Sequence, residues 1–421
     1  MRPVLSTAVV LLLIAAVVSP VSARNGGSGY SRYGIGDLQY GLTSGLLGMA
    51  GSGLAVVSAS SINGENPADW TSISRVRISF TGLYEGYKSS DYESSGYFST
   101  MRFSGLMIAI PLVSSSGITF TAGVNPYSNV NYNISIPTTL GGYDYVLQYL
   151  GEGGISQGTM GVSWRPGAAL SLGAKLDYYF GTLRHSVTQM FAGNPPQYTT
   201  AADLRSTSMT GLGSTFGATF RGLGDLLHIP AGHTLSLAAA VSTTSWLTAS
   251  DERYYVYTTS YTSYDTLISP DRKFKLPVRI AGGISYQGDR WTVAADYYTQ
   301  PWSQALDDGT PLTGIRDCSR WSFGGEYTPK TENNSPFLQR LTYRAGFFYQ
   351  QSYYDINGTG VNEAGGSAGC SVPVFSDSKL GLALSYSVRG TTDQLMQKDH
   401  IIRFSLSLDI GELWFIKTPE E

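Results

Sequence analysis

Strict alternation of apolar and polar residues is the feature that most constrains how this chain can fold. Near the C-terminal end every second residue is apolar, namely Ile402, Phe404, Leu406, Leu408 and Ile410. The same pattern recurs over residues 170–178, 274–287 and 380–388. A helix repeats every 3.6 residues and cannot place such a pattern on one face, whereas a strand can. The chain is therefore predicted to consist of strands with an apolar side and a polar side.

The composition indicates that the apolar side faces lipid. Only 14% of the residues are charged, whereas there are 50 Gly and 29 Tyr. Outer-membrane barrels combine a lipid-facing apolar band with aromatic residues at both interfaces, and glycine is common where strands bend. After the first 23 residues, the longest apolar runs, such as 106–113, have the length of a strand and not of a spanning helix. We therefore predict an all-β fold, a transmembrane antiparallel β-barrel in the outer membrane.

Marking every alternating segment gives about fourteen strands. They cover residues 74–88, 96–112, 117–127, 155–165, 170–181, 206–221, 234–246, 274–287, 290–300, 317–328, 341–353, 362–373, 379–389 and 400–410. The connections then alternate between long and short, as expected where short periplasmic turns occupy one end of a barrel. The three longest expected loops are residues 128–154, 182–205 and 247–273.

The first residues predict export. Arg2 precedes an apolar stretch at residues 9–18, and the triplet at residues 21–23 (Val-Ser-Ala) is typical of a signal-peptide cleavage site. We expect a signal peptide at residues 1–23.

The segment that follows is expected to fill the barrel. Residues 24–72 are rich in Gly, Ala and Ser, which pack closely in a confined space, so they are predicted to form a lumenal plug. A flexible periplasmic tail is the alternative. The barrel should then extend over residues 73–415, and a short periplasmic tail over 416–421.

Charge and cysteine content argue against several classes of function. The net charge is −3 without a basic stripe, which disfavours nucleic acid as a partner. The four His show no metal-ligand spacing, so neither a metal nor a cofactor is expected. Cys318 and Cys370 fall two predicted strands apart, at ~10 Å and beyond disulfide reach. A G-x-S-x-G match at residues 365–369 lies in a predicted strand, without the strand-turn-helix that a hydrolase needs. We expect a monomer that is not an enzyme.

A short motif precedes the first predicted strand. Residues 62–70 read Ile-Asn-Gly-Glu-Asn-Pro-Ala-Asp-Trp. The triplet Asn66, Pro67 and Ala68, preceded by a small-residue segment and followed by a barrel, resembles the FadL family of outer-membrane transporters for hydrophobic compounds. Three further pieces are similar to relatives in Bacteroidetes-type bacteria: residues 30–36, 276–277 and 411–415.

This resemblance implies a barrel with an N-terminal hatch that admits long-chain fatty acids or aromatic hydrocarbons by passive diffusion. It also implies that the ligand is captured near the extracellular loops, descends into the lumen and leaves through a gap in the wall. The hatch triplet maps onto Asn66, Pro67 and Ala68. The sequence departs from the family because it continues past Phe415 to a charged tail.

The third predicted strand contains Gly123, Asn125 and Pro126. Proline cannot donate to a β-ladder and is normally excluded from central strands, and every strand of a closed barrel is central. Pro126 therefore either opens the wall as a lateral exit, which matches the family's kinked third strand, or ends the strand before a long loop. Pro277 raises the same question in the eighth strand.

Inward-facing positions collect charged residues. An Arg inside the barrel could bind a fatty acid carboxylate through charge-assisted hydrogen bonds. The alternative is pairing with other lumen charges or with the plug, because an unpaired buried charge is costly. The basic candidates for ligand binding are Arg102, Arg279, Arg77, Lys175 and Arg344.

Two functions from different classes follow. The first is passive uptake of hydrophobic small molecules through a dry, apolar channel beside the plug, with tyrosines of the expected long loops, such as Tyr143, Tyr145 and Tyr255, as a first capture site. The same tyrosines could instead form an interface girdle. The second function is a non-transporting scaffold or shuttle in secretion or surface assembly, with a sealed wall, a filled lumen and a protein partner at its loops. Membrane lipid contacts the barrel in both.

Overall fold

The computed structural model describes residues 24–41, 43–191, 200–230, 232–258, 262–330, 335–374, 377–393 and 396–412. The expected signal peptide and the expected tail at 416–421 lie outside these residues.

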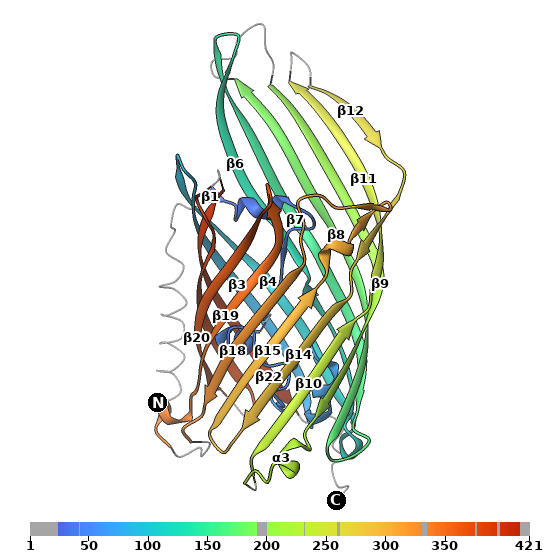
Figure 1. Cartoon of the computed structure of the whole chain (residues 1–421), viewed down its shortest axis with the longest axis vertical. Coiled ribbons are helices and arrows are strands. Elements are labelled where there is room, and N and C mark those ends of the chain that lie inside the picture. The colour runs from blue at the N-terminus through green and yellow to red at the C-terminus, as the bar shows by residue number, and fades with distance from the viewer. Residues whose placement is uncertain are drawn as a thin grey trace, which may run out of the picture.

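The described residues form a closed antiparallel barrel of fourteen wall strands, which confirms the predicted fold class (Figure 1). Closure comes from the first and last strands, which pair from Val76↔Glu412 to Ser90↔Lys398. Unbroken wall strands are β3 (Val76–Ser90), β4 (Ser95–Val113), β7 (Tyr143–Trp164), β8 (Leu170–Phe191), β9 (Thr200–Phe220), β15 (Trp291–Gln300), β18 (Cys318–Tyr327), β19 (Thr342–Ile356), β20 (Thr359–Pro373), β21 (Lys379–Gly390) and β22 (Lys398–Glu412). As predicted, β19 separates the strands of the free Cys318 and Cys370.

Three wall strands are broken into consecutive pieces. The third consists of β5 (Ile118–Pro126) and β6 (Ser128–Leu140), and the seventh of β10 (Thr234–Ser242) and β11 (Ser245–Thr258). The eighth consists of β12 (Thr262–Ile268), β13 (Arg272–Leu276) and β14 (Arg279–Gln287). The prediction of one unbroken strand over residues 274–287 is therefore wrong at Pro277, because proline lacks the N–H that a ladder needs.

Short elements connect the wall strands or precede them. They are β1 (Arg24–Asn25), η1 (Gly29–Arg32), β2 (Asp37–Leu38), α2 (Ser44–Gly48), η2 (Pro67–Ser72), η3 (Ser114–Ser116), α3 (Leu223–Leu226), η4 (Trp302–Gln304), β16 (Leu306–Asp307), β17 (Thr310–Pro311) and η5 (Phe337–Arg340). None of the described helices is long and apolar enough to cross a bilayer.

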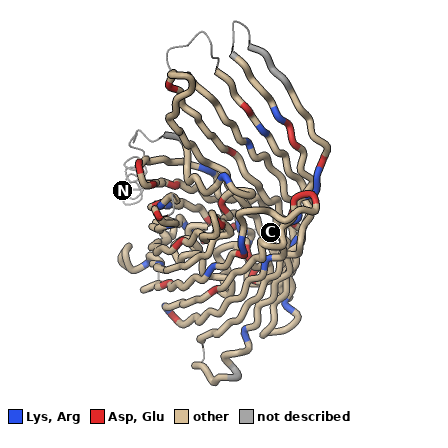
Figure 2. The backbone as a smooth tube through the Cα atoms, turned by 45° about the horizontal axis from the view of Figure 1, so that its top comes forward, with Lys and Arg blue, Asp and Glu red and all other residues tan. Residues whose placement is uncertain are grey.

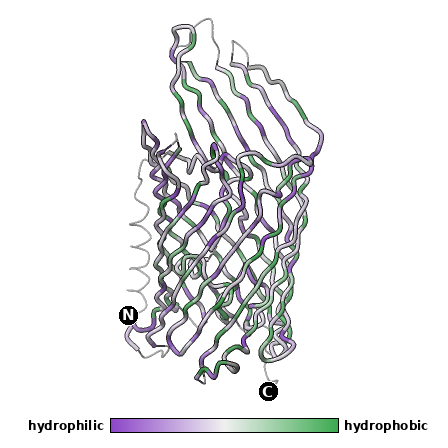
Figure 3. Tube along the Cα trace, viewed as in Figure 1, coloured by the Kyte–Doolittle hydropathy of each residue, from purple (hydrophilic) through white to green (hydrophobic). Residues whose placement is uncertain are grey.

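The outer surface of the wall is apolar where the strands cross the membrane. On β7, Met160, Val162 and Trp164 are exposed, whereas the intervening Ser163 and the nearby Thr159 are buried inside. Hydrophobic and hydrophilic positions alternate in this way along the wall strands in Figure 3. The alternation is what separates lipid from a polar interior.

The three long loops expected from the sequence are largely strands. Residues 128–154, 182–205 and 247–273 contribute most of β6 and β12 and the upper parts of β7, β8, β9 and β11, which rise beyond the rest of the barrel in Figure 1. The prediction failed because it searched for apolar residues on the outward face. In these extensions the outward positions are mostly polar, as with Asn131, Asn133 and Ser135 on β6.

Residues 26–73, termed the N-terminal segment, contact the inner side of the wall. The backbone N–H groups of Gly53 and Leu54 donate to Asp296 of β15 at 2.6 and 2.8 Å. Ser285 of β14 donates to the Ala55 carbonyl at 2.7 Å, and the Ser44 and Ser407 hydroxyls are hydrogen-bonded.

Paired glycines of the wall give the N-terminal segment room to approach. Gly173 and Gly217 face each other on β8 and β9, and a Cβ at Gly217 would lie 2.8 Å from Cδ of Pro67. Gly324 and Gly346 are paired on β18 and β19, and a Cβ at Gly346 would lie 2.8 Å from the Ala50 nitrogen. Real Cβ atoms essentially never approach so closely, so these positions require glycine.

Gly217→Val should therefore displace the Asn66–Pro67 backbone, whereas Gly282→Val should not, because nothing lies within 4 Å of a Cβ at Gly282. Overpacking of this kind costs about 1–3 kcal/mol. The thermal unfolding midpoint and the protease sensitivity of the N-terminal segment in the folded barrel should change for Gly217→Val alone. Equal behaviour of the two variants would contradict the close docking.

Candidate functional site

The wall is split beside the third strand. β5 pairs with β4 from Val113↔Ile118 to Leu106↔Val124, and its last residue, Pro126, pairs only with β7. β6 continues along β7, from Val130↔Gly153 to Leu140↔Tyr143. Among the described residues, no ladder joins β6 to β4, so both strands have an open edge above Leu106.

The beginning of the chain lines both edges of this split. β1 pairs in parallel with β4 at Phe98 and Ser99, and β2 pairs antiparallel with β6 at Asn129 and Ser128. Between them, the Ser31 hydroxyl donates to the Asn131 carbonyl at 3.0 Å and accepts from the Asn131 N–H at 3.1 Å. In a continuous wall, the neighbouring strand would pair with these backbone groups of β4 and β6. Here residues 24–39 pair with some of them instead.

The predicted opening residues lie at the lower end of this split. Gly123 pairs with Met107 of β4, Pro126 ends β5, and the Tyr127 N–H donates to Ile155 of β7 at 2.8 Å. Asn125 is buried, and its Oδ1 would lie 2.5 Å from a Cβ at Gly105, a residue with φ +156°. The structure brings these positions together with the N-terminal segment.

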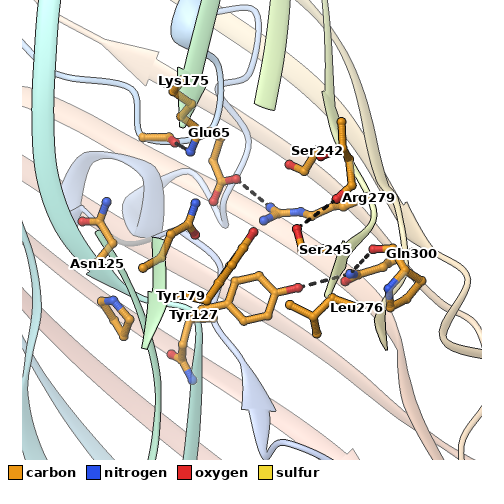
Figure 4. Close-up of a pocket in the computed structure, with 16 residues that line it drawn as sticks. Glu65, Asn125, Tyr127, Lys175, Tyr179, Ser242, Ser245, Leu276, Arg279 and Gln300 are labelled. Carbon is orange, nitrogen blue, oxygen red and sulfur yellow. Dashed lines mark hydrogen bonds and ion pairs between the residues drawn. The ribbon is translucent and has the colours of Figure 1, made fainter. Parts of the chain in front are cut away.

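A polar cavity of about 30 Å³ lies where the breaks of the three broken strands meet (Figure 4). The breaks contribute Pro126 and Tyr127, Thr243, and Pro277, while Glu65 comes from the N-terminal segment. Arg279 donates to Glu65 at 2.6 Å across the cavity. Below this pair, Gln300 donates to the Tyr127 hydroxyl at 3.1 Å and to the Pro277 carbonyl at 2.9 Å.

All five basic residues predicted to bind a ligand have partners inside the protein. Figure 2 marks the basic and acidic positions along the backbone. The pairs are Arg102 with Glu85 at 2.8 Å, Arg279 with Glu65 at 2.6 Å, Arg77 with Asp377, Lys175 with Asp177 at 3.5 Å, and Arg344 with Glu326 at 2.7 Å. Lys175 also donates to the Gly64 carbonyl at 3.0 Å.

Further buried ion pairs join wall strands to one another, and one of them includes the N-terminal segment. Glu85 accepts from Arg102 and Arg403, and Arg403 also donates to Glu363 at 2.8 Å. The buried Arg389 joins Asp37 of β2 at 2.8 Å to Asp399 of β22 at 3.3 Å. Breaking one partner of a buried pair costs more than the pair gains on forming, so the Asp37–Arg389 contact holds β2 against the wall.

The triplet Asn66, Pro67 and Ala68 is buried and begins η2. The Asn66 side chain accepts from the Ala68 N–H at 3.0 Å and donates to Thr219 of β9 at 2.9 Å and to the Leu54 carbonyl at 3.0 Å. These contacts make the triplet an anchor of the segment on β8 and β9, with every polar group of Asn66 satisfied.

Asp69, in the same turn, is a buried carboxyl without a salt bridge. It accepts from Thr219 at 2.8 Å and from Asn63 at 2.7 Å. Burial raises the pKa of Asp69 to about 8, while the hydrogen bonds from Thr219 and Asn63 and the charge of Arg221 lower it in part, and Asp296 raises it.

An aromatic and aliphatic cluster closes the interior above the polar cavity. Trp302 and Tyr353 stack at 4.5 Å between ring centroids, and Tyr353 lies 4.5 Å from Tyr354. Tyr30 of the N-terminal segment stacks on Tyr354 at 6.1 Å. All four rings are buried in one core with Ile35 and Tyr127.

The interior cavities are small and polar. Four of them measure about 10, 30, 60 and 110 Å³ and are lined by charged side chains. Such spaces hold a few waters, whereas sites for small ligands occupy roughly 300–1,000 Å³. None of these four cavities is the expected dry, apolar channel, because paired charges and the aromatic cluster occupy the interior around them.

Sequence reasoning missed Glu65, Tyr127, Gln300 and the break at Thr243. A signal existed for two of them: Glu65 directly precedes the triplet, and Tyr127 follows Pro126. Gln300 and Thr243 carry no local sign of their position. Among the described residues, no group of three or more His, Cys, Asp or Glu side chains could hold a metal ion.

Comparison with known proteins gives two kinds of similarity. Residues 4–419 match the model of the family described as BamG. No curated protein matches the chain.

Solved structures share the architecture. The CymD monoaromatic hydrocarbon channel is 14% identical with a TM-score of 0.58, covering 90% of this chain and 99% of that chain. The Ralstonia pickettii toluene transporter TbuX is 16% identical with a TM-score of 0.56, covering 88% and 98%. A Pseudomonas aeruginosa FadL homologue is 13% identical with a TM-score of 0.58, covering 89% and 99%. At these identities the similarity shows the fold, and a closed barrel with an apolar outer belt places the chain in the outer membrane.

Replacing either partner of the Glu65–Arg279 pair should leave a buried charge uncompensated. Glu65→Gln or Arg279→Met alone is expected to lower the free energy of unfolding by roughly 3 kcal/mol, and the double variant by less than the sum. A double-mutant cycle from denaturant unfolding in detergent measures the difference. Additive losses would show that the two side chains are not coupled.

The raised pKa of Asp69 predicts a pH dependence. Its pKa of about 8 in the folded barrel exceeds the ordinary aspartate pKa of 3.8, so its protonated form is favoured in the folded barrel. The contribution of protonated Asp69 to the free energy of unfolding is therefore complete below about pH 4 and is lost as pH rises to about 8. Relative to Asp69→Asn, the wild-type unfolding midpoint should fall over this range. Parallel pH profiles of the two proteins would contradict the assignment.

Proposed function

The chain belongs to the BamG family, and from its split wall we propose that it carries small hydrophobic compounds across the outer membrane by passive, gated transport. Support comes from the fold it shares with proteins described as toluene transporters and a monoaromatic hydrocarbon channel. Long-chain fatty acids or similar apolar molecules are the proposed substrates.

The observation that carries this proposal is the pair of open strand edges at the break of the third strand. β4 and β6 diverge above Leu106, and the stretch between them is lined by residues 24–39 instead of a ladder. Gly123, Asn125 and Pro126 mark the proposed lateral opening. Through it, an apolar molecule would pass from the lumen into the lipid without crossing the periplasmic end.

The described conformation corresponds to the closed state in this proposal. No interior cavity above about 110 Å³ is found in the four described, so the N-terminal segment must shift before a ligand passes. β1 and β2 each pair over two residues only, and a single net hydrogen bond is worth about 0.5–1.5 kcal/mol. These short ladders are the parts of the plug that open most easily, whereas the triplet at Asn66 is firmly anchored.

In the open state, basic side chains of the lumen would exchange an acidic partner in the protein for the ligand. Arg279 lies beside the rings of Tyr40 and Tyr298, at 5.4 and 5.2 Å from their centroids. If Glu65 and Tyr40 move with the segment, Arg279 is left beside the ring of Tyr298 without a carboxylate, a combination that suits a fatty acid head group. The same role as a ligand partner is proposed for the other basic candidates, Arg102, Arg77, Lys175 and Arg344.

A second candidate function is a non-transporting barrel that serves secretion or surface assembly. The filled interior favours it, because every charged candidate is paired and the aromatic cluster leaves no channel. In that case residues 24–39 would seal the wall permanently.

Uptake into liposomes separates the two functions. A Leu38→Cys/Ser128→Cys variant can form a disulfide across the β2–β6 pair and so lock the segment against the wall edge. We expect oxidation to lower uptake of labelled oleate at least tenfold and reduction to restore it, with Ser128→Cys alone as the control. Pro126→Val, which lets the ladder continue, should also slow uptake.

Uptake that is the same in the locked and reduced states would overturn segment gating. No uptake by any of these proteins, including wild type, would favour the non-transporting alternative.

A further inference from the structure

The strands that rise above the barrel reverse their polarity. On β7 the outward residues are Met160, Val162 and Trp164 in the membrane, whereas farther up three of the five are polar: Glu152, Leu150, Gln148, Val146 and Asp144. The inward residues change the opposite way, from Thr159 and Ser163 to Tyr149, Leu147 and Tyr145. No register shift interrupts the pairing of β7 with β8 along this length, so the same two faces are followed throughout.

The neighbouring strands reverse in the same manner. Inward positions of β8 change from Lys175 and Asp177 to Leu183 and Val187, and its outward positions change from Leu176 to Arg184. On β6 the inward residues Ile134 and Ile136 pair with Tyr149 and Leu147 of β7. Outward Asn133 and Ser135 pair with Leu150 and Gln148.

This reversal locates the upper part of the sheet outside the bilayer. Lipid would require apolar residues on the outward face, and there the outward face is mostly polar. The apolar face instead looks inward, over the barrel mouth, and among the described residues only β6–β9, β11 and β12 reach this height in Figure 1, so no described wall strand stands opposite. We call this surface the raised apolar face; it contains Ile134, Ile136, Tyr145, Leu147, Tyr149 and Val187.

The raised apolar face has a polar border on one flank. Inward residues of β9 and β11 form ion pairs there, Arg253 with Asp203 at 2.5 Å and Arg205 with Asp251 at 2.7 Å. An apolar centre beside a polar rim is the usual composition of a protein interface. Ile136 is 47% exposed and the other five residues are half-buried, with Ile134 and Tyr149 packed against the core that contains Tyr30 and Tyr132, so the chain's own described residues cover the apolar part only in part.

Its size suits a polypeptide. Three strands at ~4.8 Å spacing and about seven residues at ~3.3 Å each give the apolar centre roughly 300 Å², and the two bordering strands, which carry the ion pairs, raise the area of the whole surface to about 550 Å². With an equal area on a partner the interface would bury about 1,100 Å², near the lower limit for specific complexes. Ligand sites for small molecules are concave, and none of the four interior cavities is lined by these residues.

We propose that the raised apolar face docks a separate protein at the cell surface, one that presents an aliphatic and aromatic patch above the barrel mouth. A second copy in the same membrane cannot reach it, because each raised sheet faces across its own mouth and a neighbouring barrel sits beside the wall. The edge of β6 beyond Asn129 is open along Ile134–Leu140 in the ladders described, and offers the partner backbone groups for strand addition. This inference does not depend on transport.

Photocrosslinking on intact cells tests it. A benzoylphenylalanine probe placed at Leu147, on the raised apolar face, should form a protein adduct that external protease removes. The same probe at the adjacent Gln148, on the outward face, should not. From a probe at Tyr149, the adduct should fall at least tenfold in an Ile136→Glu/Leu147→Glu variant, which places two charges in the apolar centre.

The matched control is Ser135→Glu/Gln148→Glu, the neighbouring cross-strand pair on the opposite face, which should leave the adduct unchanged. Heat-modifiable migration on a gel shows that both barrels are folded. Adducts of equal yield from both faces, attachment to lipid or a small molecule only, or no adduct at all would each overturn the proposal.

Discussion

Everything in this structure depends on the need to pair backbone hydrogen-bonding groups in a bilayer that offers no water. An unsatisfied group in lipid costs several kcal/mol, so a sheet crosses a membrane only when it is closed. The β22–β3 ladder provides that closure over the full height of both strands. At the third strand the rule is met in another way, because β4 and β6 diverge and residues 24–39 lie along their edges. Residues 24–39 therefore complete the wall of the barrel at this strand.

The interior follows from the same constraint. Charges face inward because lipid excludes them, and each must then find a partner, as Arg102 and Arg403 do with Glu85, and Arg279 with Glu65. Paired glycines such as Gly173 and Gly217 let the N-terminal segment approach close enough to supply some of those partners. The interior is tightly filled, and the β1–β4 and β2–β6 ladders of the wall are short and weak. Together these features support the proposal that the barrel opens at its side and not along its axis.

The sequence predicted the parts of the fold that repeat. The alternation at residues 402–410 sufficed for the strands, the closed barrel and the inward position of the charges, because lipid imposes one pattern on every membrane strand. It failed for residues 128–154, where the alternation continues but its polarity reverses outside the membrane. Pro126 and Pro277 signalled two of the three breaks, since proline removes a donor. The meeting of these breaks around Glu65 was not predictable, because it depends on strand register across the lumen.

The central claim is that residues 26–73 are part of the folded barrel and not a loose tail. Amide hydrogen exchange of the protein in lipid tests it most directly, because Gly53, Leu54 and Ala68 each donate their N–H to a side chain of Asp296 or Asn66. The account predicts that these amides exchange as slowly as those of β21 and β22, while residues near β1 and β2 exchange faster. Exchange of the whole segment at the rate of an unstructured peptide would contradict it.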